Sequence, residues 1–315
     1  MTLNSNKIFQ YLPLTHTRAT FRLVTKLHKH KVTSILDLED SAQNPFSLNE
    51  TEIIKSDARK NLISYIKSER FNNSDFQATP YIRINSISSK FFEEDIRLIN
   101  ELADDNFYFE GIFFPKTESA EDIDKLISNI SYESKVVPMI ETVKGNDFKN
   151  EIVSHPPIKA FHYGHFDFAL DQKQWPFLDP NHLEYWYLID EFIEISNEHK
   201  KDFIHTPFPF TNDPALFWQM INFMKKRYSS NSIVFCTLNA ELSLSEQVDE
   251  NKLEFIEYPR DITDLKKLAV EIINDFEANR ANKRSFGVSN NRFIPPHQYF
   301  AAQNYLKHIK PQVND

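Results

Sequence analysis

The feature that most constrains this chain is an alternation, repeated eight times, between a short apolar run and a longer segment of helical character. The apolar runs are Lys7–Leu14, Val32–Leu38, Thr79–Ile84, Gly111–Phe114, Val136–Ile140, Ile158–Tyr163, Asp202–Thr206 and Ser232–Thr237. Short apolar runs followed by apolar residues at helical spacing are typical of strand–helix units. Eight such units predict an α/β fold, a TIM (β/α)8 barrel.

Two further helices are expected after the eighth unit, at Asp261–Arg280 and Pro295–Lys310, joined by a polar loop. We therefore divide the chain into a catalytic barrel domain, residues 1–260, and a C-terminal helical extension, residues 261–315. The extension lies outside an eightfold barrel, so we expect it to pack on a neighbouring subunit. The aromatic stretch 175–192 is tempting as a substrate platform, but aromatic residues on long helices favour a core or a subunit interface.

Composition narrows the possible partners. A net charge of −9 argues against a nucleic-acid or anionic-membrane partner, since both require a clustered basic surface. The single cysteine, Cys236, excludes internal disulfides, fits a reducing compartment and is expected to be a small buried apolar residue. The first residues lack the pattern of a signal peptide, and no apolar run is long enough to span a bilayer. We expect a cytoplasmic protein.

Carboxylates follow two consecutive strands of the predicted barrel. Glu141 comes directly after Val136–Ile140, and Asp167 follows Ile158–Tyr163. The C-terminal ends of barrel strands open onto one face, so both side chains are expected at neighbouring strand tips. Two carboxylates with room for water and a chelating substrate predict a Mg²⁺ site. Helix capping or pairing with a lysine is the alternative for each.

Glycine is scarce, with four residues in 315. Three of them, Gly111, Gly145 and Gly164, lie beside predicted strand ends. The remaining glycines are expected where the backbone needs a positive φ or where another group approaches closely.

Four segments together resemble the HpcH/HpaI aldolase and citrate lyase β-subunit (CitE-like) superfamily. They are SILDLEDS (34–41), YIRINS (81–86), GIFFPKTESAEDID (111–124), and the pair PMIETVKG and FHYGHFDFALD (138–145 and 161–171). A weaker similarity lies in FIPPHQYFAAQNYL (293–306). The resemblance implies a (β/α)8 barrel, a Mg²⁺ ion, a homo-trimer or hexamer, and carbon–carbon lyase or aldolase chemistry on 2-oxo acids or CoA thioesters.

The resemblance also suggests roles for individual residues. Glu141 and Asp167 match the family's metal ligands, and Arg83 matches the arginine that binds the substrate carboxylate; a structural ion pair is the alternative for Arg83. Glu39 of the DLED segment corresponds to a glutamate near the metal.

The remaining candidates are Asp40 beside it, Lys116 at the tip of strand four, and His165. Lys116 is expected to neutralise the carboxylates around it or to form a structural ion pair. His165 is expected to contact a metal ligand or the substrate. Strand periodicity would place Asp37 and Glu39 on one face and Asp40 on the other.

The chain departs from the family at three places. Leu14 follows Pro13 where the family has a Pro-Gly turn, CTLNAEL (236–242) replaces a His-Pro segment, and Pro295 aligns with a C-terminal aspartate. We therefore discount CoA thioesters and favour a small oxo-acid substrate. Two alternatives stay open: a divergent paralogue acting on a sugar acid or biosynthetic intermediate, and a non-catalytic metabolite-binding or assembly subunit.

Overall fold

Eight parallel strands close into a barrel in sequence order, each paired with the next and β8 paired with β1. The computed structural model describes residues 7–14, 17–67, 79–228, 233–248, 253–281, 286–289 and 292–308. The barrel strands are β1 Ile8–Pro13, β2 Val32–Asp37, β3 Tyr81–Arg83, β4 Gly111–Phe114, β5 Lys135–Ile140, β6 Ala160–Tyr163, β7 Asp202–Phe208 and β8 Ile233–Thr237. The predicted TIM barrel is confirmed.

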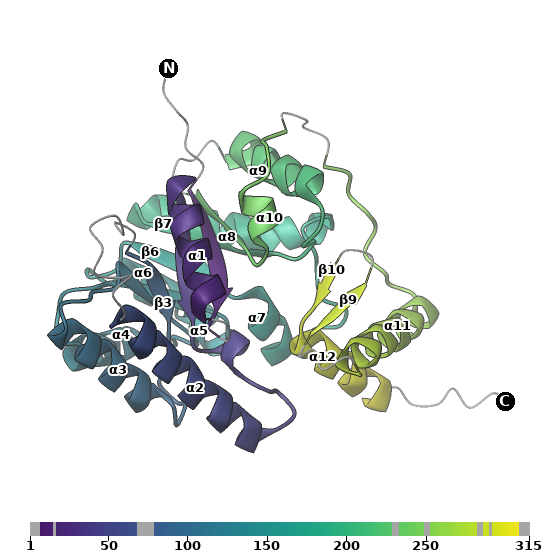
Figure 1. Ribbon diagram of the computed structural model, residues 1–315. Coiled ribbons are helices and arrows are strands. Elements are labelled where there is room, and N and C mark those ends of the chain that lie inside the picture. Colours follow the sequence, from purple (N-terminus) through teal and green to yellow (C-terminus); the bar gives the residue numbers. More distant parts are fainter. Residues whose placement is uncertain are drawn as a thin grey trace.

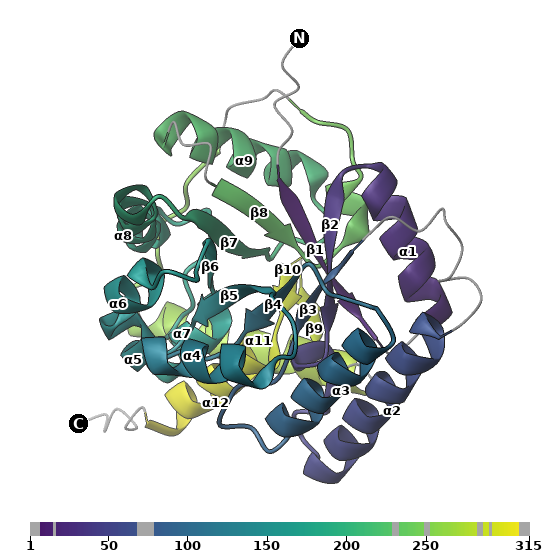
Figure 2. The same ribbon diagram turned by 90° about the vertical axis from the view of Figure 1, so that its left-hand side faces the viewer.

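Helices connect the strands and form the outer layer of the barrel (Figure 2). They are α1 Thr17–Lys29, the short 3-10 turn η1 Asp40–Ala42, α2 Leu48–Ile66, α3 Phe92–Asp104, α4 Ala120–Asn129, α5 Val143–Asp147, α6 Lys149–Ser154, α7 His165–Asp171, α8 Leu183–His199, α9 Pro214–Tyr228 and α10 Ala240–Ser243. The bounds of the eight strands agree with the predicted apolar runs within two residues. Ser119 caps the start of α4, because its hydroxyl accepts a hydrogen bond from the backbone N–H of Asp122.

Strand alternation divides the apolar residues between two cores. In β1, Ile8 and Leu12 pack outwards against the helices, whereas Phe9 and Tyr11 point into the barrel. The interior core also contains Cys236, which is fully buried as predicted. Filling the interior with side chains leaves room for a ligand only beyond the strand ends.

The C-terminal part of the chain covers one end of the barrel. It consists of α11 Ile262–Arg280, a hairpin of β9 Gly287–Ser289 and β10 Arg292–Ile294, and α12 Pro296–His308. Figures 1 and 2 place these elements together at the same end. We call residues 286–308 the C-terminal cap. The predicted polar loop at 281–292 was wrong in part, since it contains β9 and the start of β10.

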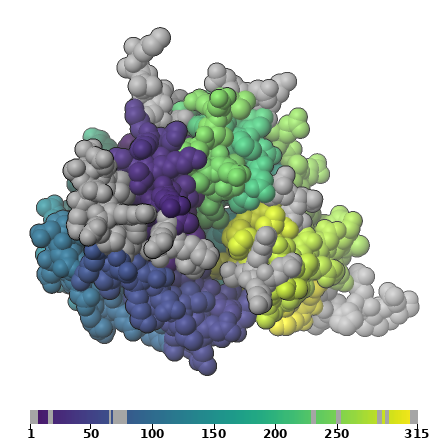
Figure 3. All heavy atoms as spheres, viewed as in Figure 1, coloured from purple at the N-terminus to yellow at the C-terminus, as the bar shows by residue number. Residues whose placement is uncertain are grey.

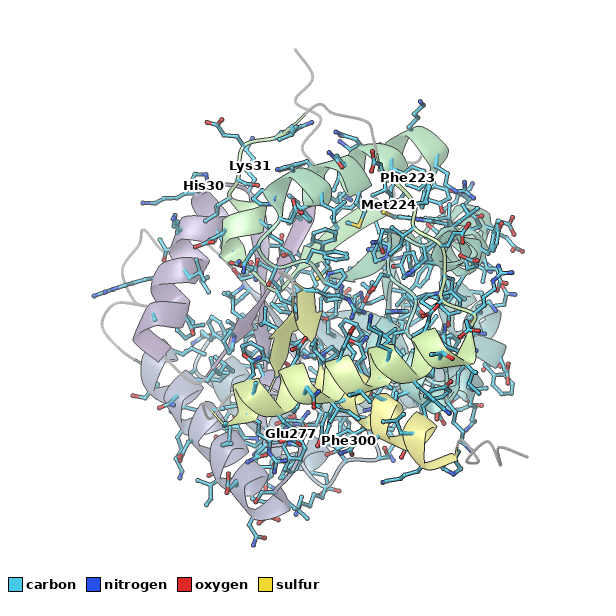
Figure 4. The ribbon with its side chains drawn as sticks, turned by 90° about the vertical axis from the view of Figure 1, so that its right-hand side faces the viewer. His30, Lys31, Phe223, Met224, Glu277 and Phe300 are labelled. Atoms are coloured by element: carbon cyan, nitrogen blue, oxygen red, sulfur yellow. The ribbon has the colours of Figure 1, made fainter. Side chains whose placement is uncertain are left out.

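The cap packs against its own barrel domain. Phe46, in the loop before α2, contacts Phe276, Tyr299 and Phe300, and the Arg280 guanidinium lies 3.9 Å from the centre of its ring. Glu277 of α11 and Phe300 of α12 lie close together where the two helices pack (Figure 4). In the space-filling view the yellow cap lies against the blue-violet atoms of the α2 region (Figure 3).

The aromatic stretch after α7 supplies the second support for the C-terminal elements. Trp175 stacks on Tyr305 and donates a hydrogen bond to the carbonyl of Leu265, while Tyr185 and Trp186 are buried in the barrel's outer core. This agrees with the predicted core role of the stretch. Packing of the extension on a neighbouring subunit stays a prediction. None of the helices in the described ranges has the length and apolar character needed to cross a membrane.

Candidate active site

A cavity of about 790 Å³ lies between the strand ends and the C-terminal cap. The barrel contributes Tyr11, Arg83, Glu141 and Thr206 to its lining, the connecting segments contribute Asp40, His165 and Asp167, and the cap contributes Phe293, Pro295 and His297. Volumes of this order suit a small ligand. The cavity is therefore formed by residues far apart in the sequence, and its roof comes from the same chain.

Glu141 lies directly beyond β5, where it is 2% exposed. Its Oε1 accepts a hydrogen bond from the backbone N–H of Lys116 at 2.9 Å. Burial raises the pKa of Glu141 well above its ordinary value, and the nearby carboxylates of Asp167 and Glu39 raise it further. The carboxyl group therefore lies where a cation would favour its charged form.

Gly164 makes room for that carboxyl group. A Cβ on Gly164 would lie 2.1 Å from Oε2 and 2.5 Å from Cβ of Glu141. Close approach is thus the reason for this glycine. The alternative expectation, a positive φ, is wrong for every described glycine, and the positive φ values belong to five other residues that include Lys116.

Asp167 lies in the first turn of α7, just beyond β6, and two basic groups flank it. Lys116 Nζ is 3.1 Å from Oδ1, and His297 Nε2 of the cap is 3.3 Å from Oδ2. Burial alone would raise the pKa of Asp167, but His297 and Lys116 outweigh it and hold that pKa well below its usual range. Asp167 is therefore a carboxylate at neutral pH.

Lys116 contacts all three acidic groups proposed to lie near the metal. Besides Asp167, its Nζ lies 3.7 Å from Glu39 Oε1, and its own backbone N–H binds Glu141. Its φ of 51° is in the left-handed region, a strained conformation of the kind found at functional sites. The predicted neutralising role fits this geometry.

The DLED segment differs from its predicted arrangement. Strand β2 ends at Asp37, Glu39 is the residue before the turn η1, and Asp40 is the first residue of that turn. Period-two alternation therefore does not apply, and the prediction that Asp40 faces away from Asp37 and Glu39 was wrong. Lys55 of α2 holds this turn by donating hydrogen bonds to the carbonyls of Leu38 and Glu39.

Arg83 is the residue on which the three acidic side chains converge. Asp37 binds its Nε and Nη2 at 2.7 and 2.6 Å, while Asp40 Oδ2 and Glu39 Oε2 each lie 2.9 Å from Nη1. The guanidinium also lies over the ring of Tyr11, 4.7 Å from its centre. The structural ion pair weighed as the alternative for Arg83 is thus present. The hydrogen bonds to Asp37 and Asp40 leave one N–H on Nη1 and one on Nη2 for a ligand.

His165 lies in the cavity wall with both ring nitrogens engaged. Nδ1 is 2.9 Å from the Tyr163 hydroxyl and Nε2 is 2.6 Å from the carbonyl of Leu178. Burial lowers the pKa of His165 to about 4, so the ring is neutral. These contacts favour a structural role for His165.

Five of the seven predicted site residues line the cavity: Arg83, Asp40, Glu141, Asp167 and His165. Glu39 and Lys116 do not line the cavity but contact residues that do. Burial and neighbouring Asp40 raise the pKa of Glu39 to about 8, against Arg83 and Lys116. His297 and Thr206 were not predicted. The only local signal for His297 was its place after Pro295-Pro296 at a helix start.

The geometry fits a divalent cation held by Glu141 and Asp167. Five carboxyl groups lie near two permanent cations, Arg83 and Lys116, and burial with neighbouring carboxylates raises the pKa of Glu141 and of Glu39, so a divalent cation would stabilise the charged forms of these two groups. Glu141 forms no ion pair with another side chain among the described residues. The charges of Lys116 and Arg83 lower its pKa but do not offset the effect of burial. No three His, Cys, Asp or Glu side chains in the described ranges form a complete ligand set. A Mg²⁺ ion would thus take its other ligands from water and substrate, as it usually does.

An acidic cavity at the C-terminal end of a closed parallel barrel defines the class: a (β/α)8-barrel protein with its site in the position usual for barrel enzymes. The sequence model of the HpcH/HpaI aldolase/citrate lyase family matches residues 27–213, and the chain belongs to this family of lyases and aldolases. No curated protein matches the chain.

Solved structures share the fold at low sequence identity. A ternary complex of Haloferax volcanii malate synthase with pyruvate and acetyl-CoA has a TM-score of 0.66 at 12% identity, covering 96% of this chain and 90% of that one. The Mycobacterium tuberculosis protein CitE, in complex with magnesium, acetoacetate and coenzyme A, has a TM-score of 0.55 at 13% identity over 97% and 98%. RipC from Yersinia pestis has a TM-score of 0.53 at 19% identity over 76% and 92%.

Proposed function

We propose that this protein is a Mg²⁺-dependent carbon–carbon lyase or aldolase acting on a small 2-oxo acid. The observation that carries the proposal is the convergence of Glu141 and Asp167 on an acidic cavity, with Lys116 in contact with both. Family membership supports the reaction class, and the CitE complexes with magnesium and pyruvate or oxaloacetate support the metal and the ligand type.

The residues of the chain have distinct tasks in this scheme. Glu141 and Asp167 would hold the ion, which when bound supplies Lewis-acid stabilisation of the charge that develops on the substrate oxygen as the bond breaks. Lys116 keeps Asp167 charged and reduces repulsion among the carboxylates. Arg83 would bind the substrate carboxylate through its remaining Nη2 hydrogen, in a guanidinium plane fixed by Asp37.

Glu39 fits a role in proton movement better than His165 does. Both nitrogens of His165 are engaged within the protein, whereas Glu39 Oε2, although within ion-pair distance of Arg83, has no hydrogen-bond partner. The cap encloses the reacting groups with Phe293 and Pro295, which limits access of water. We propose a free acid rather than a CoA thioester as substrate, because Leu14 and Pro295 replace the family's Pro-Gly turn and C-terminal aspartate.

The test is titration of the protein with Mg²⁺ and then with pyruvate or oxaloacetate, followed by calorimetry and thermal unfolding. We expect oxo-acid binding only with Mg²⁺, and an oxo-acid at 100 times its Kd should add about 2.7 kcal/mol of stability. Glu141→Ala should abolish Mg²⁺ binding and turnover. Glu118→Gln is the matched control, since Glu118 pairs with Lys144 and does not line the cavity.

Turnover undiminished by EDTA would reject the proposal. Mg²⁺-dependent binding without any cleavage would instead support the alternative of a metabolite-binding subunit. Cleavage of a sugar acid in preference to simple oxo-acids would support the divergent paralogue.

A further inference from the structure

The hairpin of β9 and β10 carries different side chains on its two faces. Phe293 lies opposite Val288 in the hairpin, and Ile294 lies opposite Gly287. Because side chains alternate between the faces of a strand, the first pair lies on one face and the second pair on the other. The second face packs on α11, since a Cβ on Gly287 would lie 3.1 Å from Cα of Phe276 and Ile294 is fully buried. The face with Phe293 and Val288 therefore points away from α11.

That face lines the cavity. Phe293 and Val288 belong to the cavity wall, as does Phe286 two positions before Val288, and all three residues are half-buried. The ring of Phe293 lies 5.3 Å from that of Phe286 and 6.3 Å from that of Phe166 of α7, which also lines the cavity. We call Phe166, Phe286, Val288 and Phe293 the apolar wall. Their side chains offer a ligand apolar surface and no hydrogen-bonding group.

The apolar wall begins beside the proposed metal site. Phe166 directly precedes Asp167 in the first turn of α7. His297, which follows Phe293 in the cap, lies 3.3 Å from Oδ2 of Asp167. A ligand that chelates an ion at Asp167 is therefore within reach of the apolar wall.

The size of the cavity also calls for a longer ligand than pyruvate. The cavity volume is about 790 Å³, and pockets of about 300–1,000 Å³ enclose drug-sized molecules. A three-carbon acid at the metal would leave most of this volume, and with it the apolar wall, in contact with water.

We propose that the substrate is a 2-oxo acid with an apolar tail, branched alkyl or aromatic, that packs against the apolar wall. This rests on the proposed function and names the substrate class of the same site. Each methylene group that leaves water for the wall should raise the affinity about threefold. A carboxylate at the end of the tail would lose its hydration there and gain no partner from these side chains.

The test compares 5-methyl-2-oxohexanoate with 2-oxoglutarate, which have nearly the same size and shape because an isopropyl group replaces the distal carboxylate. Neither contains the β-hydroxy carbonyl unit that retro-aldol cleavage needs, so calorimetry in saturating Mg²⁺ measures binding alone. We expect 5-methyl-2-oxohexanoate to bind roughly tenfold more tightly. Affinity should also rise about threefold per step from pyruvate to 2-oxobutanoate and then to 2-oxopentanoate.

A single substitution ties this preference to the hairpin. Val288→Thr puts a hydroxyl group on the apolar wall in a side chain of nearly equal volume that strands also favour. The preference for 5-methyl-2-oxohexanoate should fall about threefold, while the affinity for Mg²⁺ stays unchanged because no charge is added or removed. Val270→Thr is the matched control, since Val270 is exposed on α11 and lies outside the cavity lining. That variant should keep the full preference.

The outcomes are distinguishable. Mg²⁺-dependent binding in which 2-oxoglutarate binds as tightly or more tightly, affinity is flat along the alkyl series, or Val288→Thr leaves the preference unchanged would overturn the apolar tail and leave the proposed function intact. Binding of none of these acids in Mg²⁺ would overturn the proposed function and this inference together.

Discussion

Replacing Gly164 by alanine probes the reasoning about the metal site most directly. The added Cβ would lie 2.1 Å from Oε2 of Glu141 and 2.5 Å from its Cβ. The second distance involves an atom next to the backbone, so rotation of the carboxyl group alone does not relieve the clash. Overpacking of this kind costs about 1–3 kcal/mol of folding stability. Glu141 must also shift from its position, and we expect the affinity for Mg²⁺ to fall about 10- to 100-fold.

The assay is Mg²⁺ titration by calorimetry together with urea unfolding of the same variant. Gly111→Ala is the matched control, because its Cβ would meet the ring of Tyr81 at 2.4 Å and the Lys135 carbonyl at 2.8 Å, at the start of β4 and outside the cavity lining. That variant should lose similar stability and keep its Mg²⁺ affinity. Unchanged Mg²⁺ affinity in Gly164→Ala, or an equal loss in both variants, would refute the placement of the ion at Glu141.

The remaining predictions concern the cap, a buried histidine and the thiol. Arg292→Met leaves Asp179 without its partner in a largely buried pair and should cost about 3–5 kcal/mol, with faster hydrogen exchange in α12; exchange equal to the wild type would contradict the role of this pair. Burial lowers the pKa of His205 to about 3, so the unfolded state binds more protons below its own pKa of about 6.5. The contribution of the neutral His205 to folding stability is fully present above about pH 6.5 and should decrease by about 2 kcal/mol by pH 5, as measured by urea unfolding. If the stability of His205→Asn decreases with falling pH as steeply as that of the wild type, or more steeply, this explanation is wrong. Cys236 should react with thiol reagents only on unfolding, because the thiol is fully buried and burial raises its pKa.

Much of the fold could be predicted because its signals are local. The strand Gly111–Phe114 has the bounds expected from its apolar run, and α11 lies within one residue of the predicted helix Asp261–Arg280. The hairpin of β9 and β10 could not be predicted in the same way. Its residues read as a polar loop, and its pairing is stabilised by contacts with Pro209 and Asp179 that lie about 80 to 110 positions earlier.

The site shows the same division. Glu141, Asp167, Arg83 and Lys116 sit at strand ends, and barrel topology alone brings strand ends together, so the sequence determined that these residues would meet at one face. The sequence did not determine what each one contacts. Arg83 is held by Asp37, Glu39 and Asp40 because β2 ends one residue earlier than its apolar pattern indicates.

Sequence by itself thus determined the barrel, the family and the acidic residues at the mouth, since each depends on short-range patterns or on strand order. Tertiary structure alone decided that the end of the chain folds back over its own barrel and brings His297 to Asp167, 130 residues earlier in the sequence. The physical reason is that the cap is held by an aromatic cluster at Phe46 and Trp175 and by the ion pair between Arg292 and Asp179. Such contacts join segments that lie far apart in the sequence, and no periodic pattern in the sequence predicts which distant segments will meet.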